Sequence, residues 1–231
     1  MNGYVYYPGC SLKGNSRSYE ESILPVFKEL GLPLEELEDW NCCGGSPYNS
    51  VDELGSLCLG ARNLALAEKK GLDVVTPCSS CYIMLDRVNH HFKESPRVKA
   101  QVDEALAAGN MEYKGTVRTR HMLDVFVNDV GYDAIKSKVK NNLGELKVAP
   151  YYGCQVVRPG PSFDHPENPQ TMERLIDSLG AKASPFPLKA RCCGGSLVIP
   201  EENVALELTY KLLDNAVSNG AECIITVCPL C

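Results

Sequence analysis

Hydrophobic positions along the chain form short β-rich runs that alternate with longer segments of helical periodicity. In the first part of the chain this pattern predicts a strand at 4–9, a helix at 18–30, a strand at 34–38, a helix at 51–70 and a strand at 72–76. The last part repeats the order, with a strand at 147–152, a helix at 168–179, a strand at 182–186, a helix at 201–219 and a strand at 222–227.

Alternating strands and helices predict an α/β fold with short parallel sheets covered by helices. We expect two similar small lobes, at 1–85 and 147–231, joined by a mainly helical spacer at 86–146. Within the spacer the pattern favours helices at 97–108, 116–127 and 132–140.

The cysteines repeat with the predicted elements. The chain has 12 cysteines, and ten of them form two sets of five with nearly the same spacing. In each set, a single cysteine precedes a Cys-Cys pair, and 34 residues separate that pair from a Cys-x-x-Cys motif. The first set is Cys10, Cys42, Cys43, Cys78 and Cys81, and the second is Cys154, Cys192, Cys193, Cys228 and Cys231.

Residues beside the cysteines repeat as well. YYPGC (6–10) corresponds to YYGC (151–154), and NCCGGS (41–46) corresponds to RCCGGS (191–196). Both sets fall at the ends of predicted strands, where open α/β sheets place their ligands. The pattern indicates an internal duplication, with one thiol-rich site in each half.

Composition narrows the class of protein. The 231 residues carry a net charge of -6 and contain no block of Lys or Arg, which argues against binding to nucleic acid. No apolar run is long enough for a transmembrane segment, and the N-terminus does not look like a signal peptide. We therefore expect a cytoplasmic protein whose thiols are reduced. The chain has no Gly-rich nucleotide loop, which argues against nucleotide or flavin binding.

Five thiolates at one site suit an iron–sulfur cluster. Zinc takes four ligands in a tetrahedron, and an adjacent Cys-Cys pair fits two metals of a cluster more easily than one. Backbone N–H groups of the Gly-Gly that follows each pair could donate to sulfur. Zinc binding and disulfide or free thiols remain the alternatives.

The two cysteine sets together resemble the duplicated cysteine-rich CCG domain of the catalytic B-type component of heterodisulfide reductase and its bacterial relatives. The resemblance extends from Tyr4 to Cys231. It implies two non-cubane [4Fe-4S] clusters, each held by all five cysteines of a set. It also implies that a disulfide, CoM-S-S-CoB or a related one, binds between the clusters and is reduced to two thiols by one-electron steps.

The resemblance further implies partners: a small iron–sulfur C-type subunit that delivers electrons, and a flavin-containing A-type subunit behind it. An alternative function is an electron-transfer subunit of another oxidoreductase complex, of the glycolate, lactate or succinate type, without disulfide chemistry. Because the first half continues well past Cys81 whereas the second stops at Cys231, we expect the natural protein to be longer.

A few other residues are candidates for function. An anionic disulfide needs local positive charge, which the cations near the motifs could provide: Lys13, Arg17, Arg158, Lys189 and Arg191. His165 is a candidate proton donor, and Arg191 precedes the second Cys-Cys pair. We expect Cys58 and Cys223 to pack in the core and His121 to be structural.

Overall fold

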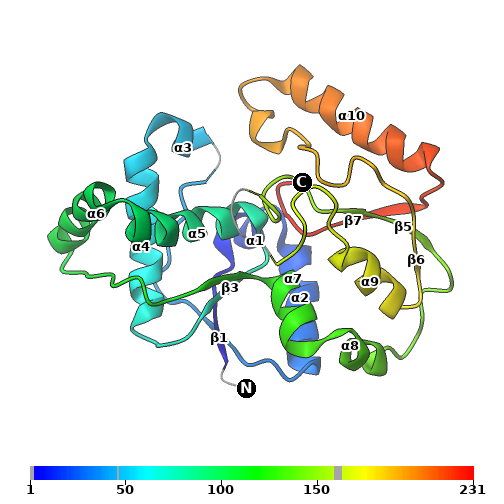
Figure 1. Cartoon of the computed structure of the whole chain (residues 1–231), viewed down its shortest axis with the longest axis horizontal. Coiled ribbons are helices and arrows are strands. Elements are labelled where there is room, and N and C mark those ends of the chain that lie inside the picture. The colour runs from blue at the N-terminus through cyan, green and yellow to red at the C-terminus, as the bar shows by residue number, and fades with distance from the viewer. Residues whose placement is uncertain (1–2, 46, 159–162) are drawn as a thin grey trace. The chain divides into compact units, whose positions relative to one another are not determined.

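The chain folds into two compact units, which divide inside the expected spacer, between Met122 and Leu123. The computed structural model describes residues 3–45, 47–158 and 163–231. Each unit contains one parallel sheet with helices packed around it (Figure 1).

The first unit is built on a sheet with strand order β2-β1-β3-β4. Its strands are β1 (Tyr4–Tyr6), β2 (Leu34–Glu36), β3 (Val74–Thr76) and β4 (Thr119–His121). Its helices are α1 (Gly9–Lys13), α2 (Arg17–Glu29), α3 (Pro47–Val51), α4 (Glu53–Glu68), α5 (Ser79–Glu94) and α6 (Pro96–Ala108). The buried strands β1 and β3 form the centre of the core, and α4, α5 and α6 pack on one another beside them (Figure 1).

The second unit has a smaller sheet, ordered β6-β5-β7. Its strands are β5 (Lys147–Tyr151), β6 (Lys182–Ala183) and β7 (Cys223–Thr226). Its helices are α8 (Tyr132–Lys138), α9 (Thr171–Ser178) and α10 (Glu202–Ser218), with a 3₁₀ turn, η2 (Gly195–Leu197). The short helix α7 (Met122–Asp124) crosses the division and leads into a π-helix, η1 (Val125–Val130). A core cluster around Leu123, Tyr152 and Met172 lies in this unit.

The structure bears out the α/β fold class, with two small parallel sheets. It corrects one predicted element, the helix at 116–127. Residues 119–121 form β4, which pairs in parallel with β3 in the register Val74↔Thr119 to Thr76↔His121, and the helical conformation begins only at Met122. The free edge of β3 supplies the backbone partners, and all three residues of β4 are buried. A strand of three residues is too short to show the alternation of hydrophobic and polar side chains that predicts a strand from the sequence.

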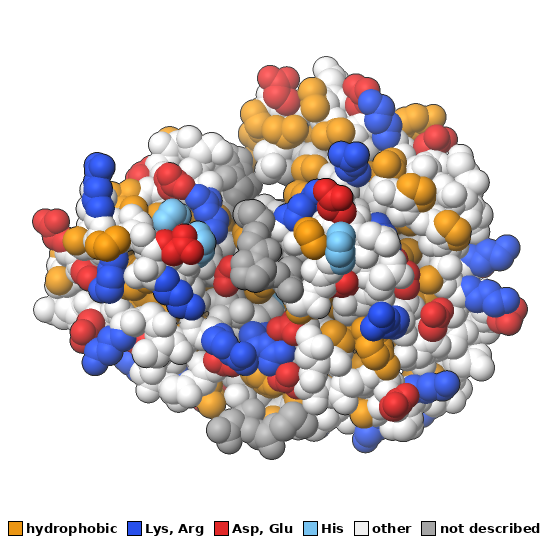
Figure 2. Space-filling model, in the orientation of Figure 1, with side chains coloured by type: hydrophobic (Ala, Val, Ile, Leu, Met, Phe, Trp, Pro, Cys, Tyr) orange, Lys and Arg blue, Asp and Glu red, His pale blue; other side chains and the backbone are white. Residues whose placement is uncertain are grey.

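The corresponding helices of the two units differ in how far they are covered. In α4, Leu57 and Leu64 are at most 2% exposed, because α5 and α6 pack on this helix. In α10, Leu206 and Leu213 are 60% and 51% exposed. Hydrophobic side chains gather on the surface over α10 in Figure 2. None of the helices in the described ranges is long and apolar enough to cross a membrane.

Candidate thiol sites

In the first unit, three strand ends bring five thiols to one edge of the sheet. Cys10 follows β1 and lies in α1, and Cys42 and Cys43 lie in the loop after β2. Cys78 follows β3 as the residue that precedes α5, and Cys81 lies in the first turn of that helix. Because the strands are parallel, their carboxyl ends meet at this edge.

The five sulfur atoms of the first site form a chain of contacts. The Sγ atoms of Cys10 and Cys42 are 3.9 Å apart, and those of Cys43 and Cys81 are 3.6 Å apart. The thiol of Cys42 also bonds to Cys43, and that of Cys78 bonds to Cys81. Cys10 and Cys42 are exposed whereas the other three are buried, so the site has one open side.

The second unit repeats this arrangement at the ends of β5 and β7. Cys154 bonds to Cys192, Cys193 bonds to Cys231, and Cys228 bonds to Cys231. They correspond to three of the four contacts in the first site. The duplication inferred from the spacing therefore extends to the pairing of the sulfur atoms, although Cys231 is exposed whereas its counterpart Cys81 is buried.

Backbone N–H groups point at sulfur in both sites. The amide of Gly45 donates to Cys43 Sγ at 3.4 Å, and that of Gly195 donates to Cys193 Sγ at 3.3 Å. In the second site the amide of Gly194 also donates to Cys192 Sγ, at 3.3 Å. The Gly-Gly after each pair thus provides the donors expected from its position.

One tyrosine in each unit fixes the loop that carries the Cys-Cys pair. The hydroxyl of Tyr7 donates to the carbonyl oxygen of Asn41 at 2.7 Å, and that of Tyr151 donates to the carbonyl oxygen of Arg191 at 2.8 Å. Each acceptor is the residue just before the pair. Burial, and then the negative charge of nearby thiolates, raises the pKa of both tyrosines, which keeps the hydroxyls protonated as donors.

The second cysteine of each pair is the one most easily ionised. Hydrogen bonds from Cys42 and Cys81 lower the pKa of Cys43 despite its burial. A hydrogen bond from Cys231, with a further bond from the Gly195 amide, outweighs burial and lowers the pKa of Cys193 to about 6. A thiolate at this position is the form that binds metal.

The thiols of each site fit an iron–sulfur cluster by the nature and number of their donors. Five sulfur atoms exceed the four ligands of a zinc ion, and their contacts run as a chain of pairs. All twelve cysteines are free thiols.

The other candidate residues lie in different surroundings. His165 is in an exposed loop, where its Nδ1 accepts the amides of Glu167 at 3.2 Å and Asn168 at 3.0 Å. Arg191 is exposed and, together with Arg158, lines a pocket of about 280 Å³. The hydrogen bonds of His165 therefore lie within its own loop, and Arg191 is open to solvent.

Three of the candidate cations are engaged within the protein. Lys189 is buried and pairs with Glu173 at 2.5 Å, whereas Lys13 pairs with Glu20 and Glu36. Arg158 donates to the carbonyl oxygen of Ala190. These bonds hold the fold together and leave less positive charge available to a ligand.

Two cysteines outside the sets differ from each other. Cys58 is half-buried in α4, whereas Cys223 is exposed in β7, contrary to the expectation that it packs in the core. Cys223 is exposed because β7 is poorly covered, and this strand has no fully buried residue.

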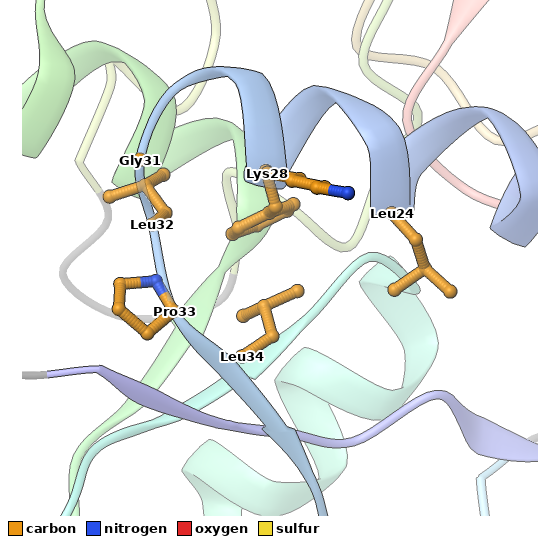
Figure 3. A pocket seen from close by; sticks show the side chains of 7 residues that line it. Leu24, Lys28, Gly31, Leu32, Pro33 and Leu34 are labelled. Carbon is orange, nitrogen blue, oxygen red and sulfur yellow. The ribbon is translucent and has the colours of Figure 1, made fainter.

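A pocket of about 430 Å³ lies between α2 and β2, and its lining residues include Leu24, Lys28, Leu32 and Pro33 (Figure 3). None of the residues that line it is a cysteine.

The comparisons with known proteins agree with the duplication. The CCG family, described as a cysteine-rich domain, matches the chain twice, over residues 4–86 and 148–231. The chain is 39% identical over 230 residues to the 8-methylmenaquinol:fumarate reductase membrane anchor subunit of Wolinella succinogenes, an alignment that covers 99% of this chain and 80% of that subunit. It is 32% identical over 240 residues to a protein of Archaeoglobus profundus that is named as similar to the B-type component of heterodisulfide reductase, with 100% and 80% covered.

A solved structure shares the fold. The crystal structure of a hypothetical protein from Helicobacter pylori superposes with a TM-score of 0.78 at 15% identity, over 99% of this chain. This chain spans 41% of the length of that protein. With two matched domains that hold all ten paired thiols, the chain belongs to the CCG cysteine-rich domain family.

Proposed function

We propose that the chain is an iron–sulfur subunit of an oxidoreductase complex, with one non-cubane [4Fe-4S] cluster in each unit. The ligands would be the five cysteines of each site. The observation that carries this proposal is the repeat of the same three thiol–thiol contacts in two sites that are separate in sequence. Each cluster, when bound, would supply one electron at a time.

The protein's own groups would prepare each site for a negatively charged cluster. The thiols of Cys43 and Cys193 ionise readily, and the amides of Gly45 and Gly195 donate to their sulfur atoms. Hydrogen bonds to cluster sulfur tune the reduction potential. The hydroxyls of Tyr7 and Tyr151 hold the loops that carry these thiols, so the ligands need little rearrangement when they bind iron.

For the reaction, we propose the reduction of a disulfide, CoM-S-S-CoB or a related one, to two thiols. This reaction takes two electrons and two protons, and the electrons would come from a small iron–sulfur C-type subunit supplied by a flavin-containing A-type subunit. The similarity over the whole of this chain to the heterodisulfide reductase-like protein of Archaeoglobus profundus supports this choice. Arg191, which is exposed beside Cys192, is the candidate for contact with an anionic disulfide.

A second candidate is electron transfer to a partner without disulfide chemistry. The 39% identity to a subunit of a quinol:fumarate reductase supports it. In this case the thiol sites and their clusters would be the same, and only the final acceptor would differ.

One experiment tests the cluster proposal and separates the two reactions. The protein is purified anaerobically, and its iron and labile sulfide are measured together with its EPR spectrum. We expect about eight irons per chain, four for each cluster. An EPR signal that changes when CoM-S-S-CoB is added supports disulfide reduction, whereas clusters that do not respond to it support electron transfer alone. Two zinc ions and no iron would refute both.

The variant Cys193→Ala adds a control for independent sites. It should lose the cluster of the second unit and keep that of the first, so iron should fall by half. Equal loss from both sites would contradict the assignment of one cluster to each set of five cysteines.

A further inference from the structure

We infer that His121 is a positioning residue of the first thiol site and that it makes the two sites unequal. The inference rests on the proposed clusters. His121 is the last residue of β4, and its side chain is fully buried. Burial of an imidazole is unfavourable unless its nitrogen atoms have hydrogen-bond partners. The residues that His121 contacts therefore indicate which part of the protein it holds in place.

The partner lies inside the Cys78-x-x-Cys81 segment. Nε2 of His121 is 3.4 Å from Oγ of Ser79, the residue directly after Cys78, and Ser79 is only 1% exposed. The imidazole ring also meets the ring of Tyr82 edge to face, with centroids 5.8 Å apart. Since Tyr82 directly follows Cys81, His121 contacts the segment within and just beyond the two thiols.

The sheet places His121 there. In the parallel pairing of β3 with β4, His121 lies opposite Thr76, whose Oγ1 accepts the amide of Cys78 at 3.4 Å. Thr76 at the end of β3 and His121 at the end of β4 therefore both form hydrogen bonds with the Cys78–Ser79 segment. This arrangement fixes the start of α5, and with it the positions of Cys78 and Cys81.

The second site differs at the position that corresponds to Ser79. Pro229, which has no hydroxyl group, occupies the position that corresponds to Ser79. The duplicated sites thus share their thiols but differ in this hydrogen bond.

The difference should appear in the reduction potentials. With its proton on Nε2, His121 donates to Ser79 Oγ, so the imidazole and the hydroxyl are two polar groups held at the Cys78-x-x-Cys81 segment. Donors close to a cluster stabilise its reduced, more negative state. Removal of His121 should therefore shift the potential of the first site to more negative values and leave the second site unchanged.

The test uses His121→Gln, Ser79→Ala and the double variant, each in the Cys193→Ala protein, where only the first cluster should remain. Midpoint potentials are measured by EPR-monitored titration of the anaerobic protein. We expect a negative shift in each single variant and no larger shift in the double variant, because the two residues act through one bond. A double variant that shows the sum of two independent shifts would overturn the coupling.

A second readout does not need iron. In the apo protein, His121→Gln should speed the alkylation of Cys78 and Cys81 by iodoacetamide, measured by mass spectrometry, while Cys228 reacts at its usual rate. Tyr113→Phe is the matched control, because it removes a buried hydrogen bond to Asn89 that involves none of the thiols. It should lower the melting temperature without changing the potential or the alkylation rates.

The outcomes are distinguishable. If His121→Gln behaves like Tyr113→Phe, with lower stability but unchanged potential and alkylation, then His121 is only structural and the inference is wrong. If the Cys193→Ala parent binds no iron, the cluster proposal fails, whereas faster alkylation of Cys78 in His121→Gln would still show that His121 positions this segment.

Discussion

Gly9 and Gly153 provide the sharpest test of how closely the backbone fits around the thiols. They occupy corresponding positions, directly before Cys10 and Cys154, and both have positive φ angles, +74° and +70°. A Cβ atom added at Gly9 would lie 2.7 Å from Cys81 Sγ, whereas one added at Gly153 would lie 3.5 Å from Cys231 Sγ. Replacement by alanine therefore introduces the same backbone strain at both positions but a steric overlap at only one.

The two effects have different sizes. The left-handed conformation costs an alanine about 1–2 kcal/mol, and both variants share this loss of stability. In Gly9→Ala the sulfur of Cys81 must also retreat by about 0.7 Å to reach ordinary contact, in a site where this thiol is buried. Binding sites tolerate displacements of about 0.5 Å. We therefore expect Gly9→Ala to lose the first cluster and Gly153→Ala to keep the second.

Iron content and EPR of the anaerobically purified proteins measure this difference. Gly9→Ala should contain about half of the wild-type iron, because one of the two clusters is lost, and Gly153→Ala should retain nearly all of it. Equal loss in the two variants would mean that backbone strain, and not the contact with sulfur, controls binding. Full iron in Gly9→Ala would refute the position assigned to Cys81.

Three further changes test the fold and the sites. Leu64→Ala should lower the free energy of unfolding of the first unit by about 3 kcal/mol, because this leucine is fully buried where α5 and α6 pack on α4. Urea denaturation measures the cost, and an unchanged free energy of unfolding would contradict this packing. Tyr151→Phe should slow the uptake of iron at the second site, because the loop before Cys192 loses its hydrogen bond; reconstitution followed by EPR measures it, and an unchanged rate would mean that the hydroxyl does not order this loop. Burial raises the pKa of Glu68, but bonds from the Thr116 hydroxyl and from two backbone amides outweigh it and leave the pKa below its usual value. Glu68→Gln should therefore lower the free energy of unfolding by about 1 kcal/mol near neutral pH. The difference between the variant and the wild type should disappear as the pH falls through the lowered pKa of Glu68, because the wild-type carboxylate is then protonated too. Urea titrations at several pH values measure it, and a difference that grew in acid would contradict the reasoning.

The duplication is predictable because each of its signals is local. The strands expected at 4–9 and 147–152 end in nearly the same residues, YYPGC and YYGC, and the structure places β1 and β5 inside these ranges. The convergence of the cysteines follows from one rule, that parallel strands end at the same edge. Even the role of Tyr7 and Tyr151 has a sequence signal, since both lie three residues before the first cysteine of their set.

The rest depends on contacts that no local pattern records. β4 is three residues long, and its partner β3 lies more than forty residues earlier, so periodicity alone predicts a helix for the segment TRH. The sequence likewise predicts only a structural role for His121, whereas the pairing brings it against Ser79. Nor does the sequence show that Lys189 pairs with Glu173, which engages a cation expected near the ligand.

The two units have kept the contacts that hold the thiols and have diverged in what surrounds them. Both retain the glycine amides, the tyrosine hydroxyl and the three sulfur contacts, because each is needed to place five ligands. Near this shared centre, the first unit has Ser79, which is bonded to His121, whereas the second has Pro229 at the corresponding position. The proposed clusters, held by identical sets of ligands, would therefore have different hydrogen-bond donors nearby, and such donors contribute to the reduction potential. A duplicated ligand set in unequal surroundings favours two centres that accept electrons in a defined order over two interchangeable ones.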